Sequence, residues 1–212
     1  MIIPTISLEQ QLWQKGYQYV AGVDEAGKGP LAGPVTAGAV CIHKEDQVVV
    51  GVRDSKLMSA KQREEVFGEI CQKSSAYGVG IVSAEEIDEI GIDMAVKKAM
   101  LQALAKVEEQ LDTSLNFVIV DGSKTKVLET YTSQRILKGG LYHYSIAAGS
   151  ILAKVTRDRL MKNLAKDYPL YGFGQHVGYG TAKHLEAIRQ FGPCPLHRKS
   201  FAPIKTYFPE GY

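Results

Sequence analysis

The sequence predicts an α/β fold in which a mixed five-stranded sheet is flanked by helices and followed by a C-terminal helical appendage. The first observation behind this prediction is that short apolar, β-branched runs alternate with longer helical patterns. Five of these runs are expected to be strands: 19–23, 35–42, 47–50, 76–82 and 117–120. The first three follow one another with short turns, which predicts an antiparallel meander.

The second observation is that helical periodicity fills the intervals between the later runs. A capping box at Ser59 and Gln62 precedes an apolar stripe typical of a helix. A short helical segment begins at Ser83 and breaks near Gly91, and a longer helix follows from about residue 93 to residue 111. Further helices are expected at 7–16, 145–167 and 181–190.

The third observation is a change of composition after Pro169. Glycine and aromatic residues are frequent in 171–180, and a basic, proline-rich tail follows the last predicted helix. We therefore divide the chain into a sheet domain at 1–168 and an appendage at 169–212 that packs on it.

Length and composition limit the class of protein. The chain has 212 residues, 45% of them hydrophobic, which is enough for one domain with a substantial core. A formal net charge of +2 does not by itself indicate a nucleic-acid partner. Three widely spaced cysteines, Cys41, Cys71 and Cys194, indicate reduced thiols in the cytoplasm. The sequence shows neither a signal peptide nor an apolar run of about 20 residues, so no membrane contact is expected.

Two adjacent carboxylates, Asp24 and Glu25, follow the first predicted strand and precede a glycine-rich turn, Gly27-Lys28-Gly29. Carboxylates beside a flexible, positively charged loop suit a divalent metal ion held next to a phosphate. Neighbours on a strand point to opposite faces, so both serve one site only if the strand ends or bulges there. The alternative is that one of them is functional and the other is merely solvated.

Two other aspartates are candidates for the same site. Asp121 follows the buried strand 117–120, and α/β sheets bind ligands at the carboxyl ends of central strands. Its alternative is a simple Asp-Gly turn. Asp158 falls within the apolar stripe of the helix 145–167, where an unpaired carboxylate is costly. Its alternative is a structural ion pair with Lys154, one turn earlier.

If the four carboxylates converge, either protonation or divalent cations must relieve their mutual repulsion. Hard oxygen ligands of this kind select Mg²⁺ or Mn²⁺. Two such ions about 4 Å apart would hold a scissile phosphate, activate water and stabilise the leaving oxygen. The four residues therefore predict a two-metal site acting on a phosphate.

A P-loop is an alternative reading of the same acidic segment. Residues 22–28 match the first seven positions of that motif. However, Gly29 stands where a P-loop has Ser or Thr, and Pro30 lacks the amide donor expected at a helix start. The two carboxylates would also place negative charge inside a phosphate cradle.

The appendage carries histidines, aromatic residues and cations with more than one possible role. Cys194 and His197 have zinc-like spacing, with His176 and His184 upstream, although no second close pair exists. Tyr179 and its aromatic neighbours suit stacking on bases or packing within a loop. The basic residues suit a phosphate-binding face, and each alone is more simply a solvated charge.

Together, these motifs resemble those of bacterial ribonuclease HII. They are Asp-Glu-Ala-Gly-Lys-Gly-Pro from Asp24, Asp-Ser-Lys from Asp54, Val-Asp-Gly at 120–122, the segment 150–158, and Gly-Tyr-Gly-Thr at 178–181. The resemblance implies a ribonuclease H-like fold and an enzyme dependent on Mg²⁺ or Mn²⁺. It implies cleavage of RNA in RNA–DNA hybrids, and cleavage 5′ of single ribonucleotides embedded in duplex DNA, with 3′-hydroxyl and 5′-phosphate ends. The domain 1–168 is then catalytic, the appendage 169–212 binds the substrate, and the chain is expected to be a monomer.

The resemblance also implies roles for individual residues. The metal-binding, catalytic carboxylates of the family match Asp24, Glu25, Asp121 and Asp158. The loop that reads the ribonucleotide 2′-hydroxyl through its backbone matches Gly27, Lys28 and Gly29. The tyrosine that stacks at the RNA–DNA junction matches Tyr179, and weaker candidates for phosphate contacts are Lys56 and Lys154.

Three positions depart from the family pattern. Lys28 stands where the loop usually has arginine and gives up the bidentate guanidinium. Gly140 replaces a usual aspartate, and Gly149 replaces a usual alanine within a helix, at a cost of up to about 1 kcal/mol. The sister family, ribonuclease HIII, resembles the chain less because it has a different loop after the acidic pair. An alternative from another class is a module that binds hybrids without cutting them.

Overall fold

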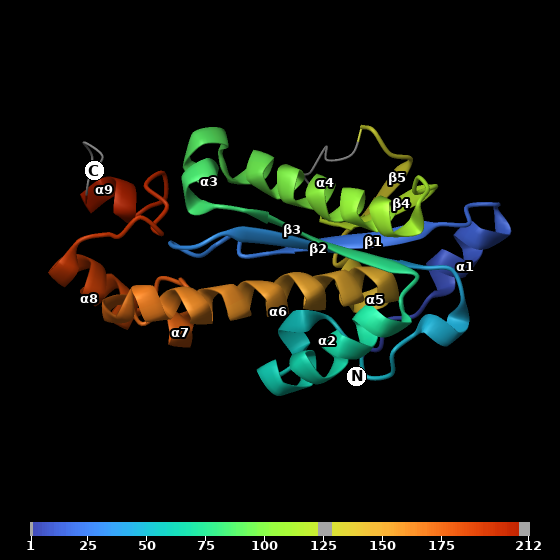
Figure 1. Ribbon diagram of the computed structural model, residues 1–212, viewed down its shortest axis with the longest axis horizontal. Coiled ribbons are helices and arrows are strands. Elements are labelled where there is room, and N and C mark those ends of the chain that lie inside the picture. Colours follow the sequence, from blue (N-terminus) through green and yellow to red (C-terminus); the bar gives the residue numbers. More distant parts are fainter. Residues whose placement is uncertain (1, 123–128, 208–212) are drawn as a thin grey trace.

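The computed structural model describes residues 2–122 and 129–207, and this part of the chain contains a five-stranded sheet between layers of helices (Figure 1). The strands lie in the order β3-β2-β1-β4-β5. Their bounds are Val20–Ala26 (β1), Val35–Ile42 (β2), Ala76–Val82 (β3), Phe117–Asp121 (β4) and Ser133–Ile136 (β5). β2 pairs antiparallel with β1 and β3, whereas β4 pairs parallel with β1 and β5. The sheet is therefore mixed, as predicted.

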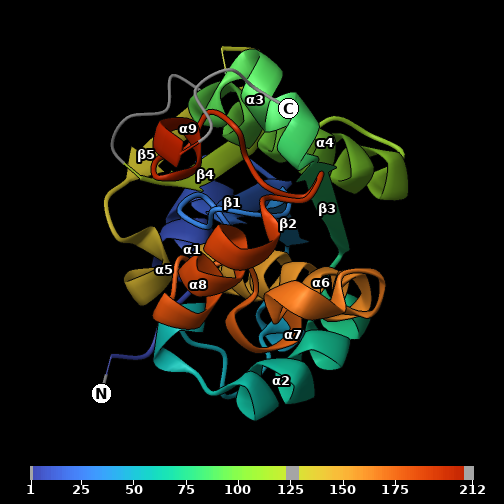
Figure 2. The same ribbon diagram turned by 90° about the vertical axis from the view of Figure 1, so that its left-hand side faces the viewer.

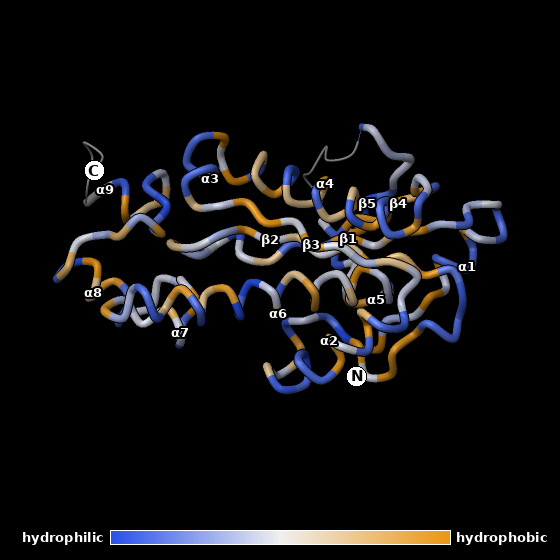
Figure 3. The backbone as a smooth tube through the Cα atoms, in the orientation of Figure 1, coloured by the Kyte–Doolittle hydropathy of each residue, from blue (hydrophilic) through white to orange (hydrophobic). Residues whose placement is uncertain are grey.

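The helices cover both faces of the sheet. On one face lies α4 (Ile92–Leu111), preceded by the short α3 (Ala84–Ile90), and on the other lies α6 (Tyr144–Asp167) with α2 (Ala60–Lys73) packed against it (Figures 1 and 2). The remaining helices are α1 (Ser7–Gln14), α5 (Gly139–Tyr142), α7 (Phe173–His176), α8 (Ala182–Phe191) and α9 (Ile204–Tyr207). The hydropathy colouring shows apolar and hydrophilic residues alternating along α4 and α6 (Figure 3), and the buried apolar residues of each helix belong to a core shared with the sheet.

Polar caps begin the helices where the sequence predicts. The Ser59 hydroxyl accepts the Gln62 amide, and the Gln62 side chain accepts the Ser59 amide, which completes the capping box of α2. Ser83 caps α3 and Thr181 caps α8 in the same way, each accepting the amide three residues later. The residue pattern was sufficient here because a cap is a local interaction.

The predicted strand at 47–50 is wrong. Its first residue ends a 3₁₀ turn, Glu45–Gln47, and the Gln47 side chain accepts the amides of His43 and Lys44. Val49 is buried against α6 and donates its amide to the Tyr144 hydroxyl at 2.9 Å. The run 47–50 is apolar because it packs on the layer formed by α2 and α6. The third strand of the antiparallel part of the sheet is instead β3.

The true fifth strand is β5, which the sequence did not indicate. Its residues, Ser-Gln-Arg-Ile, are largely exposed and pair with β4 along one edge of the sheet. An exposed edge strand needs no apolar alternation, and polar residues there discourage pairing with other chains. Hydrophobic periodicity therefore carries no signal at this position.

α6 lies very close to the sheet, at a point where glycines meet. A Cβ on Gly149 would lie 2.5 Å from the Gly38 carbonyl oxygen, and a Cβ on Gly38 would lie 2.2 Å from the Gly149 carbonyl oxygen. Glycine at position 149 lowers the helix propensity of α6 but allows the helix to pack closer to the sheet. The contact fixes how α6 sits across β1 and β2.

The C-terminal elements gather at one end of the sheet around a small core of their own (Figure 2). Tyr171 and Phe173 stack at 5.5 Å between ring centroids, and Met161 of α6 packs into the same cluster with Leu31 and Ala32. The loop after β1 and the end of α6 thus share a core with the residues of 169–207.

Two histidines are fully buried within this C-terminal core. The ring nitrogens Nε2 of His184 and His197 lie 3.0 Å apart, and His184 Nδ1 lies 2.9 Å from the Tyr179 carbonyl oxygen. Burial is the main cause that lowers the pKa of each imidazole to about 4. Both rings are therefore neutral at neutral pH.

Across the described residues, none of the helices has the length and apolar character needed to cross a membrane.

We expect Gly149→Ala to lower the free energy of unfolding by about 1–3 kcal/mol, because the added methyl group meets backbone that cannot easily move. Gly68 lies on α2, exposed, with nothing within 4 Å of an added Cβ, so Gly68→Ala should raise it by about 0.5–1 kcal/mol. Urea unfolding of both variants measures the difference. A stabilised Gly149→Ala protein would show that helix propensity outweighs the close contact.

We expect stability to fall as the pH is lowered from about 6.5 to about 4, by about 3 kcal/mol for one buried imidazole. In this window the unfolded histidine takes up a proton and the folded one does not, so protons favour unfolding. His184→Gln should be less stable at pH 7 but less sensitive to pH. Unfolding curves at several pH values provide the measurement, and parallel profiles for the two proteins would contradict the assignment.

Candidate active site

A pocket of about 410 Å³ opens at the carboxyl ends of the parallel strands β1 and β4. Four carboxylates and two lysines are among its lining residues: Asp24, Glu25, Asp54, Asp121, Lys56 and Lys138. Val23 pairs with Val120 in the parallel ladder, so the acidic residues that follow them on the two strands are neighbours. The topology of the sheet therefore brings together side chains that are about 100 residues apart in the chain.

Asp24 and Glu25 both line this pocket, although β1 continues through Ala26 and does not end at the acidic pair. The Glu25 amide donates to the Asp24 carboxylate at 2.8 Å. Burial raises the pKa of Asp24 well above its usual range, repulsion from Glu25 and Asp121 raises it further, and hydrogen bonds from the Glu25 amide and Ser150 offset only part. Burial also raises the pKa of Glu25. Negative charge is thus in excess here.

Asp121 is fixed by two backbone amides. Gly139 and Gly140 donate to its two carboxylate oxygens, at 3.0 and 3.4 Å. A Cβ on Gly140 would lie 3.1 Å from an oxygen of Asp54 and 3.7 Å from one of Asp121. Gly140, where the family pattern has aspartate, leaves the space between these two carboxylates free of a further side chain.

Asp54 is a pocket residue that the sequence analysis missed as a carboxylate of the site. It is buried and accepts the Lys56 amide at 2.9 Å, which caps a short 3₁₀ turn, Ser55–Leu57. Burial lowers the pKa of Lys56, but the carboxylates of Asp24, Asp54, Asp121 and Glu25 raise it by more. Its sequence signal was the motif Asp54-Ser55-Lys56, which was part of the family resemblance but in which only Lys56 was given a role at the site.

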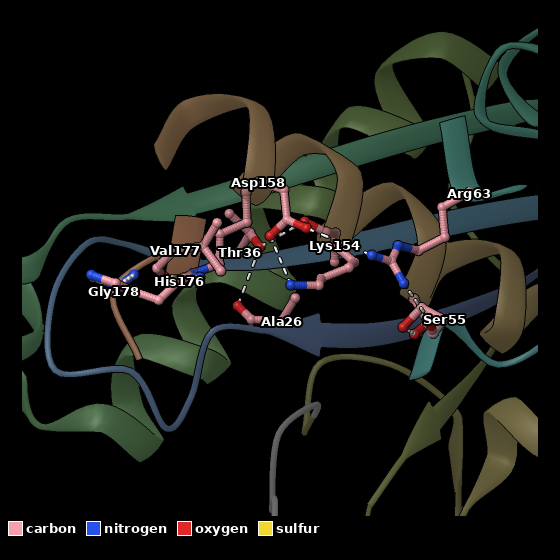
Figure 4. A network of polar contacts seen from close by, with 12 residues as sticks. Ala26, Thr36, Ser55, Arg63, Lys154, Asp158, His176, Val177 and Gly178 are labelled. Carbon is pink, nitrogen blue, oxygen red and sulfur yellow. Dashed lines mark hydrogen bonds and ion pairs between the residues drawn. The ribbon is translucent and has the colours of Figure 1, made fainter. Parts of the chain in front are cut away.

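Asp158 does not line the carboxylate pocket. Its carboxylate pairs with Lys154 at 2.7 Å on α6 and with Arg63 of α2 at 3.8 Å (Figure 4). Arg63 also donates to the carbonyl oxygens of Ser55 and Met58, so this ion pair is connected to the turn that carries Lys56. The structure thus shows the ion pair that the sequence left open as the alternative for Asp158.

The segment that carries Tyr179 lies beside the loop that follows β1, because the Leu31 amide donates to the Gly178 carbonyl oxygen at 2.8 Å. The Tyr179 ring is 44% exposed, and Lys154 Nζ lies 6.0 Å from its centroid. The Lys28 side chain forms an exposed ion pair with Asp93 at 2.5 Å. An exposed pair of this kind contributes little to stability.

The P-loop and zinc alternatives do not fit the structure. The segment 22–28 is the end of β1 and its following loop, and the chain continues into β2 rather than into a helix. His184 and His197 contact each other, and His197 Nδ1 lies 2.9 Å from the Cys194 amide nitrogen and 3.3 Å from its sulfur. These histidines form a hydrogen-bonded core.

The chemistry of the pocket fits a divalent cation. Its oxygen donors are of the type that Mg²⁺ and Mn²⁺ prefer, and its negative charge is not balanced by the two lysines. In the part of the chain that the structure describes, however, no three His, Cys, Asp or Glu side chains are grouped so that they hold an ion as they stand.

Comparisons with known proteins agree with this geometry. The family model "Ribonuclease HII" matches residues 21–204. Ribonuclease HII of Bacillus licheniformis is 49% identical to the chain over 201 residues, which are 95% of this chain and 76% of that protein.

Solved structures show the same fold. Ribonuclease H2 from Pyrococcus horikoshii OT3 superposes with a TM-score of 0.72 and 27% identity, covering 89% of this chain and 96% of that one. A Bst-RNase HIII in complex with Mn²⁺ has a TM-score of 0.71 at 18% identity, covering 91% and 70%, and shares the fold. The fold is ribonuclease H-like, and the chain belongs to the ribonuclease HII family, hydrolases that cleave the RNA strand of RNA–DNA hybrids.

Proposed function

We propose that the enzyme also cuts 5′ of a single ribonucleotide embedded in duplex DNA, by two-metal hydrolysis that leaves 3′-hydroxyl and 5′-phosphate ends. The observation that carries the proposal is the excess of carboxylates at the adjoining ends of β1 and β4. Such a site needs cations, and a phosphodiester brought there would complete their coordination. The biological role that follows is removal of misincorporated ribonucleotides and RNA primers.

Asp24, Glu25 and Asp121 are the proposed metal ligands of the pocket, and Asp158 is the fourth. Two ions, Mg²⁺ or Mn²⁺, would activate the attacking water and stabilise the leaving 3′-oxygen. Asp158 must leave Lys154 to join the other three, since the two side chains now form an ion pair. When Asp158 leaves Lys154, the lysine ammonium can contact a substrate phosphate instead.

Substrate contacts are proposed on both sides of the carboxylates. Lys56 lines the pocket and would bind a phosphate near the reacting bond. Gly27, Lys28 and Gly29 would read the 2′-hydroxyl, the group that separates RNA from DNA. The exposed Tyr179 ring would stack at the junction.

We propose that residues 1–168 form the catalytic domain and that residues 169–212 form an appendage that binds the substrate. Support comes from the position of Tyr179 on the appendage and of the four pocket carboxylates on the sheet domain. We further propose a cytoplasmic monomer. All three cysteines are free, which suits a reducing compartment.

We expect Asp121→Asn to slow cleavage of a duplex with one ribonucleotide by at least about a hundredfold, because the neutral amide weakens cation binding at the strand end. Asp112→Asn is the matched control. Asp112 is an exposed residue with left-handed backbone at the end of α4, a conformation that Asn tolerates. Single-turnover rates with Mg²⁺ are the measurement. An Asp121→Asn enzyme that cleaves the duplex as fast as the parent would show that the proposed metal mechanism is wrong.

We expect chelation of divalent ions to stop cleavage, and either Mg²⁺ or Mn²⁺ to restore it. Cleavage mapping on the same duplex should place the cut 5′ of the ribonucleotide. End-labelling should show 3′-hydroxyl and 5′-phosphate products. Either a cut on the 3′ side or full activity in excess chelator would overturn the proposed reaction.

A further inference from the structure

Two arginines, Arg157 and Arg198, are fully buried beneath the loop that joins β1 to β2. Arg157 comes from α6, and Arg198 comes from the tail that follows α8. Within the described residues, their guanidinium groups donate only to backbone carbonyl oxygens. A buried guanidinium is costly unless its donors are paired, so this bonding fixes the backbone around it.

Arg198 binds the glycine loop itself. Its Nη2 donates to the Gly27 carbonyl oxygen at 2.7 Å, and its Nη1 donates to the Lys28 carbonyl oxygen at 3.0 Å. Nε and Nη2 also donate to the Gly33 carbonyl oxygen, at 3.0 and 2.9 Å. One side chain therefore holds both ends of the loop.

Arg157 holds the return of the loop and ties it to the segment before Tyr179. Its guanidinium donates to the carbonyl oxygens of Pro34, Ala32 and Val177, at 2.8, 3.1 and 2.9 Å. The side chain passes so close beneath Gly27 that a Cβ there would lie 2.1 Å from Arg157 Nε, and Gly27 has a φ of +92°. Glycine is required at this position on both grounds.

The direction of the two carbonyls decides the direction of two amides. In a trans peptide the C=O and the following N–H point in opposite directions. Because Arg198 draws the Gly27 and Lys28 carbonyls inward, the amides of Lys28 and Gly29 point outward. Within the described part of the chain, neither amide donates a hydrogen bond to another group. Two adjacent, unpaired donors thus lie on the exposed side of the loop.

The positive charge of Arg198 lies directly behind these amides. Burial lowers the pKa of Arg198 to about 9, with repulsion from Arg157 the next cause, so the group remains a cation at neutral pH. A buried cation that donates a hydrogen bond to the carbonyl oxygen of a peptide group polarises that group. The N–H of the same peptide group then becomes a stronger hydrogen-bond donor.

We propose that Arg198, supported by Arg157, is a positioning residue for ribonucleotide selectivity: it orients the two peptide groups so that their amides bind the 2′-oxygen. The proposal rests on the proposed role of residues 27–29 in reading that hydroxyl. Arg198 touches neither the substrate nor the metal ligands. It acts through backbone direction, and the side chain at position 28 has no part in it.

Arg198→Lys tests the proposal, because lysine keeps the charge but cannot bond Gly27, Lys28 and Gly33 with one planar fork. The control is Asp88→Ala. Asp88 accepts the amides of Lys199 and Ser200, so its loss loosens the same tail without touching the loop.

The measurements are kcat and KM on a duplex with one ribonucleotide, and the inhibition constant of the all-DNA duplex of the same sequence. For Arg198→Lys we expect kcat/KM to fall by about ten- to a hundredfold, mostly in kcat, with the inhibition constant unchanged. For Asp88→Ala we expect a lower Tm and parental kinetics below it. If both variants lose activity only in proportion to their loss of folded protein, or if DNA affinity falls together with kcat/KM, the proposal is overturned.

If Arg198→Lys is unfolded at the assay temperature, Arg157→Lys decides the question by the same criteria, since lysine there loses the link to Val177. A parent enzyme that cuts a long hybrid but not the single ribonucleotide would disprove the proposed substrate and not the positioning role. The long hybrid would then serve as the substrate for the same comparison.

Discussion

The close approach of α6 to β1 and β2 is the constraint on which the site depends. With glycines at positions 38 and 149, the helix axis comes nearer to the sheet than side chains would allow. That contact fixes the distance between the sheet and the residues that follow along α6. Ser150 reaches Asp24, Asp158 faces Lys154 one turn away, and Arg157 passes beneath Gly27. A helix standing farther from the sheet would move all of these together. In this chain the close contact at position 149 therefore offsets the low helix propensity of glycine.

Charge distribution along α6 divides the site in two. At the strand ends, burial raises the pKa of Asp24 and repulsion from Glu25 and Asp121 raises it further, so a cation bound there would relieve unfavourable free energy. One helical turn further on, Lys154 already neutralises Asp158. The two regions are therefore not equivalent before ions bind. If Asp158 joins the other carboxylates at a metal ion, as proposed above, it must exchange Lys154 for that ion, and a substrate phosphate that takes Lys154 in return would offset the cost.

The sequence predicted what local chemistry and burial determine. Strands buried on one or both faces, such as β3 and β4, and helices with polar caps were found at nearly their true bounds. β5 was missed because an exposed edge has no hydrophobic pattern, and 47–50 was misassigned because apolar residues cover a helix layer as readily as they form a strand. Asp121 was identified by its strand end. Asp54 was not, because its place in the pocket depends on a long-range contact.

The same reasoning explains why the sequence suggested only a phosphate-binding face or a solvated charge for Arg198, whereas the structure shows that it is buried. A basic residue in a basic tail reads as a solvated charge, and only the fold shows that it is buried under a loop 170 residues away. Lys28 departs from the family pattern, yet its ammonium points to Asp93 while its carbonyl points to Arg198. A loop that reads a hydroxyl through peptide groups leaves its own side chains free to vary. In the described part of the chain, Arg198 is the side chain that donates to the Gly27 and Lys28 carbonyl oxygens, so we expect this buried cation to be required for turning those peptide groups outward.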